Sequence, residues 1–337
     1  MMRTIRSLGL ALLTVPLFFF GVWAWAALWI DGPASRPLAA AVVAGFTLAA
    51  LAALVFARSY GRALLATFVL CAAVLCWWLR ILPSNDGDWQ PDVARLPRVM
   101  LDGNLLTIDN VRDFVYRSEN DYDERWVTRT YDLSTLHDLD IFFSFWGPTE
   151  YAHTIMSWNF TDGPALAISI ETRKKKGESY SALLGFFRQF ELYYVVARER
   201  DVIGVRDIYR GERTYLYRLS APPEDARRLL MSYVKEINDL VDHPQWYNAL
   251  TDNCTTSIRT RVLAAGGGLP FSWRLVLNGH LPELLYERGS LDRSMPLDEL
   301  TRKSDITERA KAAGMAEDFS QQIRVGLPRM DLAAGTP

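Results

Sequence analysis

The sequence has 337 residues, enough for more than one domain, and half of them are hydrophobic. Its 37 lysine and arginine residues nearly balance its 39 aspartate and glutamate residues, for a formal net charge of −2. This balance excludes a general nucleic-acid-binding protein, which needs a basic surface. Charged residues are rare near the N-terminus, whereas the rest of the chain has the composition of a soluble protein.

Three long apolar segments follow one another at the N-terminus. Each has about 20 residues or more, enough for an α-helix to cross a hydrocarbon core about 30 Å thick. The predicted membrane helices are residues 8–30, 37–57 and 63–82. Because two further segments follow the first one directly, we predict that the first is a membrane anchor and not a cleaved signal peptide.

The positions of arginine predict the orientation of these helices. Arg3 and Arg6 precede the first helix, and Arg58 and Arg62 lie between the second and the third. Basic residues are enriched in the cytoplasmic loops of membrane proteins. We therefore predict a multi-pass protein with a cytoplasmic N-terminus, and with everything after residue 82 outside the cytoplasm.

The remaining residues predict an α+β domain. Segments rich in β-branched and aromatic residues, bounded by turn residues, are typical of strands. Strands are predicted at residues 104–111, 125–133, 139–146, 151–160, 165–172, 191–198 and 213–219. An amphipathic helix opens at Pro222 and ends before Pro244, and a second helix opens near Cys254 and ends at Gly266.

Cys254 is the one cysteine outside the predicted membrane region. Thr251, Asp252 and Asn253 are candidate caps, so Cys254 falls in the first turn of the second helix. The unsatisfied N–H groups and the helix dipole at that position favour a thiolate, which is the reactive form of a cysteine nucleophile. A buried, unreactive cysteine is the alternative interpretation.

A thiolate nucleophile needs a base, and the chain has four histidines. His153 lies within the predicted strand 151–160, among apolar and hydroxyl residues, and is either a catalytic base or a core residue. His137, His243 and His280 lie in predicted turns and loops, where a structural or surface role is expected. Histidine, cysteine and acidic residues do not pair at ligand spacings, so we predict no metal site and no cofactor.

Three separated segments carry a family resemblance. They are YAHTIMSWNF at residues 151–160, ISIETRKKKGESYS at 168–181 and YNALTDNCTTSIRT at 247–260. Together they resemble the Lnb N-terminal periplasmic domain family, over about residues 107–268. That family is named after a bacterial lipoprotein N-acyltransferase that works through cysteine and histidine. The pattern is also similar to the circularly permuted NlpC-type papain-like fold, so the resemblance implies such a domain, with an antiparallel sheet and packed helices.

The resemblance implies roles for individual residues. Cys254 matches the family's nucleophile and His153 its base. A third polar residue is expected on the following strand, where Ser169 and Glu171 share one face. We favour Glu171, because a carboxylate orients an imidazole and stabilises its charged form. Three further residues are candidates for binding the oxyanion or the substrate, namely Asn253, Tyr151 and Tyr247.

The expected protein is a membrane-anchored periplasmic acyltransferase of the bacterial inner membrane. It would move a lipid acyl chain through a thioester on Cys254, with a membrane lipid or a lipoprotein N-terminus as substrate. A cysteine peptidase or amidase acting on cell-wall peptides and a non-catalytic membrane-anchored binding module are the alternatives. The predicted parts are a membrane region at residues 1–83, a linker at 84–98, the catalytic domain at 99–325 and a disordered tail at 326–337.

Overall fold

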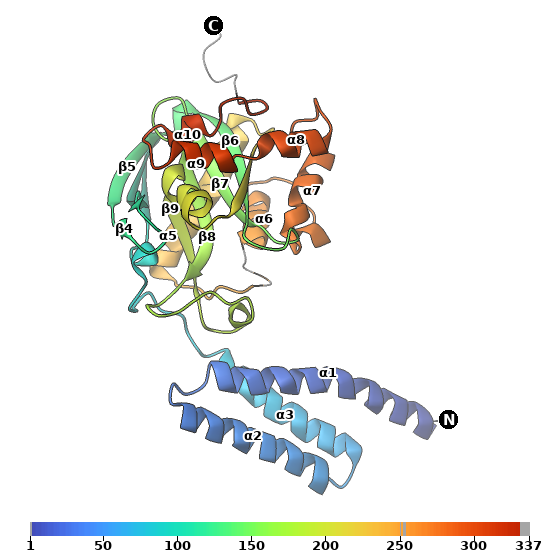
Figure 1. The fold of residues 1–337 in the computed structure, drawn as a ribbon. Coiled ribbons are helices and arrows are strands. Elements are labelled where there is room, and N and C mark those ends of the chain that lie inside the picture. The colour runs from blue at the N-terminus through green and yellow to red at the C-terminus, as the bar shows by residue number, and fades with distance from the viewer. Residues whose placement is uncertain (1, 250, 252–253, 331–337) are drawn as a thin grey trace. The chain divides into compact units, whose positions relative to one another are not determined.

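The computed structural model of the protein describes residues 2–249, 251 and 254–330, and for residues 2–11 and 254 it describes the backbone alone (Figure 1). The chain divides into two compact units. One unit comprises Met1–Ser84 together with Tyr180–Phe190, and the other comprises Asn85–Ser179 together with Glu191–Pro337. The first unit is helical, and the second is built around a sheet.

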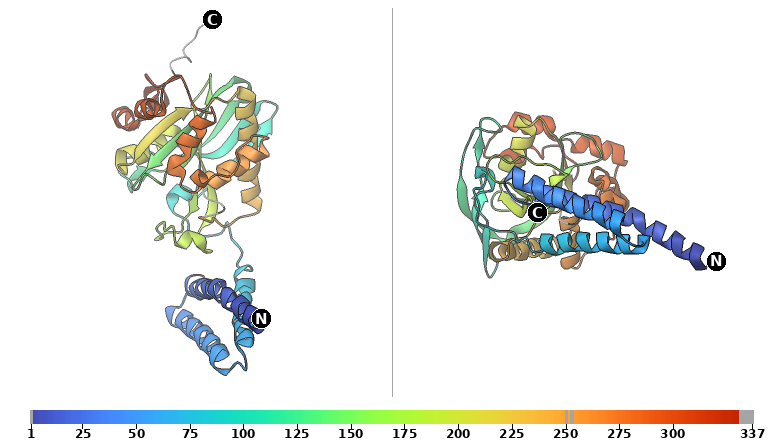
Figure 2. Two further views of the ribbon diagram at one scale, coloured as in Figure 1. Left: turned by 90° about the vertical axis from the view of Figure 1, so that its right-hand side faces the viewer. Right: turned by 90° about the horizontal axis from the view of Figure 1, so that it is seen from below.

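The first unit contains the three predicted membrane helices. They are α1 (Met2–Ile30), α2 (Arg36–Phe56) and α3 (Tyr60–Trp78), and they pack side by side (Figures 1 and 2). Each contains a segment long and apolar enough to cross a membrane. Many of their large apolar side chains are exposed, as in helices that face lipid. The prediction of three candidate membrane helices is confirmed.

The second unit is built on an eight-stranded sheet with the order β1-β2-β9-β8-β7-β6-β10, and β5 pairs with β2. The strands are β1 (Arg98–Asp102), β2 (Leu105–Arg112), β5 (Trp126–Asp132), β6 (Leu136–Phe145), β7 (His153–Phe160), β8 (Leu166–Arg173), β9 (Glu191–Ala197) and β10 (Arg213–Arg218). Among the described pairs, β2 and β9 are parallel and the others antiparallel. A separate hairpin joins β3 (Val115–Tyr116) and β4 (Tyr122–Asp123).

Helices cover both faces of the central strands, which explains why β7, β8 and β9 are buried almost throughout. On one face Tyr233 packs against Trp158 and Tyr194. On the other face Ile155 belongs to a buried cluster that includes Phe319. The helices are α4 (Glu199–Val202), α5 (Pro223–Asp242), α6 (Cys254–Ala264), α7 (Leu281–Glu287), α8 (Leu297–Ser304), α9 (Thr307–Ala313) and α10 (Phe319–Gln322), with a π-helical turn at Val205–Tyr209.

The segment expected to be a linker is packed onto the sheet unit. The Asn85 side chain donates two hydrogen bonds of 2.9 Å to backbone carbonyls at the end of α5. Trp89 and Val93 are buried, and the guanidinium carbon of Arg173 lies 4.3 Å from the centre of the Trp89 ring. Proline and aspartate in this segment form the short 3₁₀ turn Pro91–Val93, and so do not mark a flexible connection.

The expected disordered tail also begins with packed residues. Leu327 and Met330 belong to the same buried cluster as Ile155 and Phe319. Residues 331–337 lie outside the described part of the chain. The seven predicted strands correspond to β2 and β5 to β10, and their bounds differ from the predicted ones by at most two residues, except that β6 begins three residues earlier. The circularly permuted papain-like topology stays a prediction.

Candidate functional site

His153 opens β7, with its side chain 13% exposed. Its Nε2 lies 2.6 Å from the hydroxyl oxygen of Ser169 on the neighbouring strand β8. Ser169 in turn donates a hydrogen bond of 2.8 Å to Oε1 of Glu171. Because Ile155 is paired with Ser169, the antiparallel register brings Glu171 opposite His153, and the distance from Nε2 to Oε1 is 3.5 Å. The structure therefore brings together three of the predicted site residues.

The direction of these hydrogen bonds sets the tautomer of the imidazole. The hydroxyl proton of Ser169 points to Glu171, so its oxygen accepts a hydrogen bond from Nε2–H of His153. In the neutral ring, Nδ1 then carries the lone pair and is the nitrogen that can take up a proton. A carboxylate beyond the hydroxyl would stabilise the imidazolium that results.

Arg206 keeps Glu171 ionised. Its Nη2 lies 3.0 Å from Glu171 Oε1, and its Nη1 lies 3.1 Å from Oε2 of the buried Glu212. Burial alone would raise the pKa of Glu171, but the nearby imidazole of His153 and the charge of Arg206 outweigh it and hold that pKa well below its usual range. Arg206 belongs to the π-helical turn, an irregular element that is frequent at functional sites.

The helix that opens at Cys254 packs against the strands that carry these residues. The backbone of α6 begins at Cys254, and α6 contacts both β7 and β8. Figure 1 shows α6 beside these two strands. The side chain of Cys254 and the whole of Asn253 lie outside the described residues.

Asn278 connects the beginning of β7 to the beginning of α6. Its Oδ1 accepts a hydrogen bond of 2.8 Å from the N–H of Ala152, and its Nδ2 donates to the carbonyl of Ala152 at 2.6 Å. Nδ2 also lies 2.7 Å from Oγ1 of Thr255. Ala152 directly precedes His153, and Thr255 directly follows Cys254. One buried amide therefore ties together the chain segments next to both predicted catalytic residues.

Gly279 allows the segments next to Asn278 and Ala152 to lie this close together. Its N–H donates a hydrogen bond of 2.9 Å to the carbonyl of Glu150. A Cβ atom at position 279 would lie only 1.9 Å from the carbonyl oxygen of Thr149, so any other residue would push the two segments apart. Asn278 was not predicted as a site residue from the sequence, although the Asn278-Gly279 pair is a signal that two backbone segments approach closely there.

The two predicted tyrosine contacts differ in exposure. Tyr151, in the segment before β7, is 50% exposed, whereas Tyr247 is 8% exposed. Tyr151 is thus available to a substrate and Tyr247 is a core residue in this structure. Among the described residues, no group of three or more histidine, cysteine or acidic side chains is placed to hold a metal ion.

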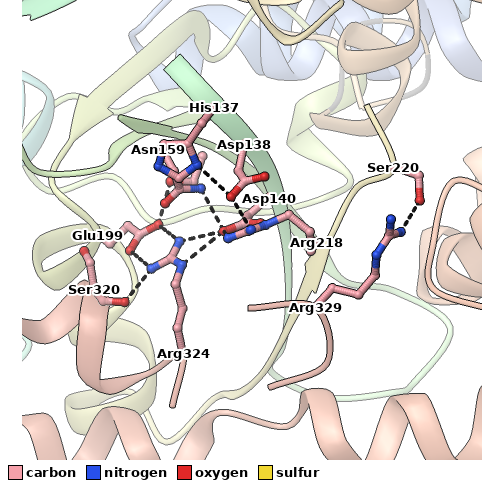
Figure 3. Close-up of polar contacts among 11 residues, drawn as sticks. His137, Asp138, Asp140, Asn159, Glu199, Arg218, Ser220, Ser320, Arg324 and Arg329 are labelled. Carbon is pink, nitrogen blue, oxygen red and sulfur yellow. Dashed lines mark hydrogen bonds and ion pairs between the residues drawn. The ribbon is translucent and has the colours of Figure 1, made fainter. Parts of the chain in front are cut away.

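A cavity of about 1460 Å³ lies at the opposite end of β7 from His153. Asn159, which lines it, is six residues along the strand from His153, a distance of about 20 Å. Figure 3 shows how Arg324 bridges Asp140 and Glu199 beside this cavity. These side chains satisfy one another, so the network is structural and separate from the site around His153.

Neither the curated proteins nor the solved structures contain a match to this chain. Residues 122–279 match the family model of the Lnb N-terminal periplasmic domain. The matched range includes β7, β8 and the start of α6, and it reaches as far as Asn278 and Gly279. The match confirms the resemblance to the Lnb N-terminal periplasmic domain over residues 122–279, in a chain with three candidate membrane helices.

Proposed function

We propose that this protein is a membrane-anchored thiol acyltransferase of the bacterial inner membrane that acts through Cys254 and His153. The observation that carries the proposal is the hydrogen-bonded chain from His153 through Ser169 to Glu171, on the strands against which α6 packs. The match of this region to the Lnb domain supports the same assignment. A histidine with a fixed tautomer and an ionised carboxylate behind it is suited to general-base catalysis.

In the proposed reaction, Nδ1 of His153 takes the proton of Cys254, and the thiolate attacks the carbonyl carbon of a lipid ester. Backbone N–H groups at the start of α6 stabilise the developing oxyanion. The ester bond breaks, His153 returns the proton to the departing alcohol, and the acyl chain remains on sulfur as a thioester. An amine then attacks the thioester, which releases an amide and regenerates the thiol.

The surroundings of the site favour a lipid substrate over a peptide. Tyr151 and Trp146, which precede β7, are 50% and 56% exposed, and Phe271 and Trp273, which precede Asn278, are 71% and 54% exposed. The hydrogen bonds of Asn278 and Gly279 hold these two segments together. Exposed aromatic side chains on segments next to the proposed catalytic residues are suited to binding an acyl chain.

The proposed function can be tested with the purified full chain and a labelled phospholipid donor. We expect transfer of the label to the amine of a lipopeptide acceptor, and no transfer by Cys254→Ala. Release of free fatty acid without transfer would indicate a hydrolase. Cleavage of cell-wall peptides in place of lipid esters would favour the peptidase alternative, and inactivity toward both substrates would favour the binding module.

The proposed orientation predicts the location of the C-terminus. Arg3 and Arg6 lie at the start of α1, and Arg58 and Arg62 lie where α2 ends and α3 begins, which favours the cytoplasm for these two regions. A reporter that is active only outside the cytoplasm should therefore be active when fused after Pro337. A cytoplasmic reporter fused at the same position should be inactive. The reverse result would place the sheet unit in the cytoplasm and overturn the orientation.

Glu171→Gln is expected to lower acyl transfer by about 10–100-fold, because the hydrogen-bonding shape is kept while the charge that stabilises the imidazolium is lost. The measurement is kcat for the labelled-lipid reaction as a function of pH. Ser169→Ala serves as the comparison, since it removes the hydroxyl between the ring and the carboxylate. A much larger loss in Ser169→Ala than in Glu171→Gln would make Ser169 the orienting residue.

Asn278→Ala is expected to lower kcat by about 10²-fold, the cost of a displacement of about 1 Å between reacting groups. Stability should fall as well, because both backbone groups of Ala152 lose a partner. Asn238→Ala is a matched control, since Asn238 makes the same two hydrogen bonds, each of 2.9 Å, to the backbone of Val99 on β1. Equal effects of both substitutions on kcat would assign Asn278 a purely structural role.

A further inference from the structure

The segment Tyr180–Phe190 lies between β8 and β9 in the sequence, yet it belongs to the same compact unit as the three membrane helices. Phe187 is buried in a cluster with Ala24, Leu28 and Val74 of the helices. The segment contains the 3₁₀ turn Leu184–Phe186. A loop that connects two strands of a sheet does not ordinarily pack against membrane helices, as this segment does.

Polar contacts fix the segment at one end of the helix bundle. Asp31, directly after α1, accepts hydrogen bonds from the Trp78 indole N–H at 2.6 Å and from the Gln189 amide at 2.7 Å. The backbone N–H of Arg188 also donates to Asp31, at 3.1 Å. The guanidinium carbon of Arg188 lies 4.0 Å from the centre of the Trp78 ring. These contacts place the segment where α1 and α3 end.

That end of the bundle has the features of a membrane interface. Trp25, Trp29 and Trp77 lie in the last turns of α1 and α3 and are 44%, 36% and 36% exposed. Tryptophan is enriched where a membrane helix leaves the hydrocarbon core. The segment Tyr180–Phe190 therefore packs at the end of the helix bundle where lipid headgroups are expected.

The segment presents large apolar side chains that the helices do not cover. Leu183 is 66% exposed, Tyr180 is 48% exposed and Phe186 is 43% exposed. No acidic residue lies between positions 179 and 190. Part of the segment's backbone is hydrogen-bonded within the segment, because the N–H groups of Phe186 and Phe187 donate to its own carbonyls. Such internal bonding is required of a backbone that leaves water.

We propose that Tyr180–Phe190 is an interfacial membrane element that inserts Leu183 and Phe186 into the bilayer leaflet at the outer ends of α1 and α3. The occupant of this apolar surface is lipid, because the surface is continuous with helices that must themselves face lipid at the same level. The polar contacts to Asp31 hold the turn so that its apolar side chains remain available. This inference rests on the membrane helices and is independent of any catalytic activity.

The test measures the depth of single labelled positions in the full chain, reconstituted into phosphatidylcholine vesicles. In a background with Cys71→Ala, Cys76→Ala and Cys254→Ser, a cysteine is introduced at position 183 or 186 and labelled with an environment-sensitive fluorophore. Val325, 68% exposed in the sheet unit, is labelled as the matched control. Lipids that carry a nitroxide near the headgroup, present in both leaflets, serve as quenchers.

We expect blue-shifted emission and strong quenching at position 183, at position 186 or at both, relative to position 325. The inference would be overturned if the labels at both positions emitted like the label at position 325 and were quenched no more strongly than it. A second measurement checks the anchoring contacts. Asp31→Ala should make both labels more water-exposed, whereas an unchanged signal would show that the contacts to Asp31 do not hold the segment in place.

Discussion

Cys254→Ser and His153→Ala are each expected to lower acyl transfer by about 10³-fold or more, which corresponds to about 4 kcal/mol in the activation free energy. A serine hydroxyl is a much weaker nucleophile than a thiolate, and without the imidazole the thiol has no base. The double variant should be little worse than either single variant, because residues that act as one unit are not additive. The measurement is kcat/KM with the labelled phospholipid.

These two substitutions are not expected to unfold the domain. Serine is close to cysteine in size, and the imidazole of His153 is partly exposed at the end of its strand. Circular dichroism of each variant in detergent checks the fold. Full activity in Cys254→Ser with an intact fold would remove the thiol mechanism. Strictly additive losses in the double variant would show that the two residues do not act together.

Arg324→Ala is expected to destabilise the sheet unit by about 3–5 kcal/mol, the usual cost of removing one partner from a buried ion pair. Its guanidinium lies 2.8 Å from Asp140 and 2.6 Å from Glu199, and both carboxylates are fully buried (Figure 3). Burial alone would raise the pKa of Asp140, but the charges of Arg324 and Arg218 hold that pKa below its usual value. Without Arg324, the buried carboxylates of Asp140 and Glu199 would lose the cation that they share.

The free energy of unfolding can be measured for the full chain in detergent by denaturant titration, with tryptophan fluorescence as the signal. Arg302→Ala is the control, because Arg302 and its partner Asp298 are 70% and 75% exposed, and such a pair is worth at most about 1 kcal/mol. If both substitutions cost the same, the network around Arg324 would not be the stabilising element that its burial indicates.

The local parts of the fold could be predicted from the sequence, because they depend on local patterns. The three membrane helices follow from apolar length, and α5 follows from its proline and acidic start and its apolar spacing. The packing of Asn85 and Trp89 onto the sheet unit could not be predicted in this way. Their partners on α5 and β8 are distant in sequence, and the surrounding proline and aspartate are equally typical of a linker.

In the candidate site, too, features that depend on local patterns could be predicted, whereas contacts between residues distant in sequence could not. Ser169 and Glu171 were predicted as alternatives because they share a strand face, and the structure shows them in series behind His153. Arg206 and Asn278 were missed. Arg206 lies 35 residues from its partner Glu171, and Asn278 lies 126 residues from its partner Ala152. Only the folded chain brings these partners together. The roles of Cys254 and His153 remain predictions from the family resemblance.

A thioester mechanism is tested by detection of the acyl-enzyme. The full chain is incubated with a diacyl phospholipid in the absence of an amine acceptor, quenched in acid and digested, and the peptide containing Cys254 is analysed by mass spectrometry. We predict a mass increase equal to one acyl group on Cys254 that is removed by neutral hydroxylamine and is absent in His153→Ala. An active enzyme in which this peptide is never acylated would contradict catalysis through a thioester on Cys254.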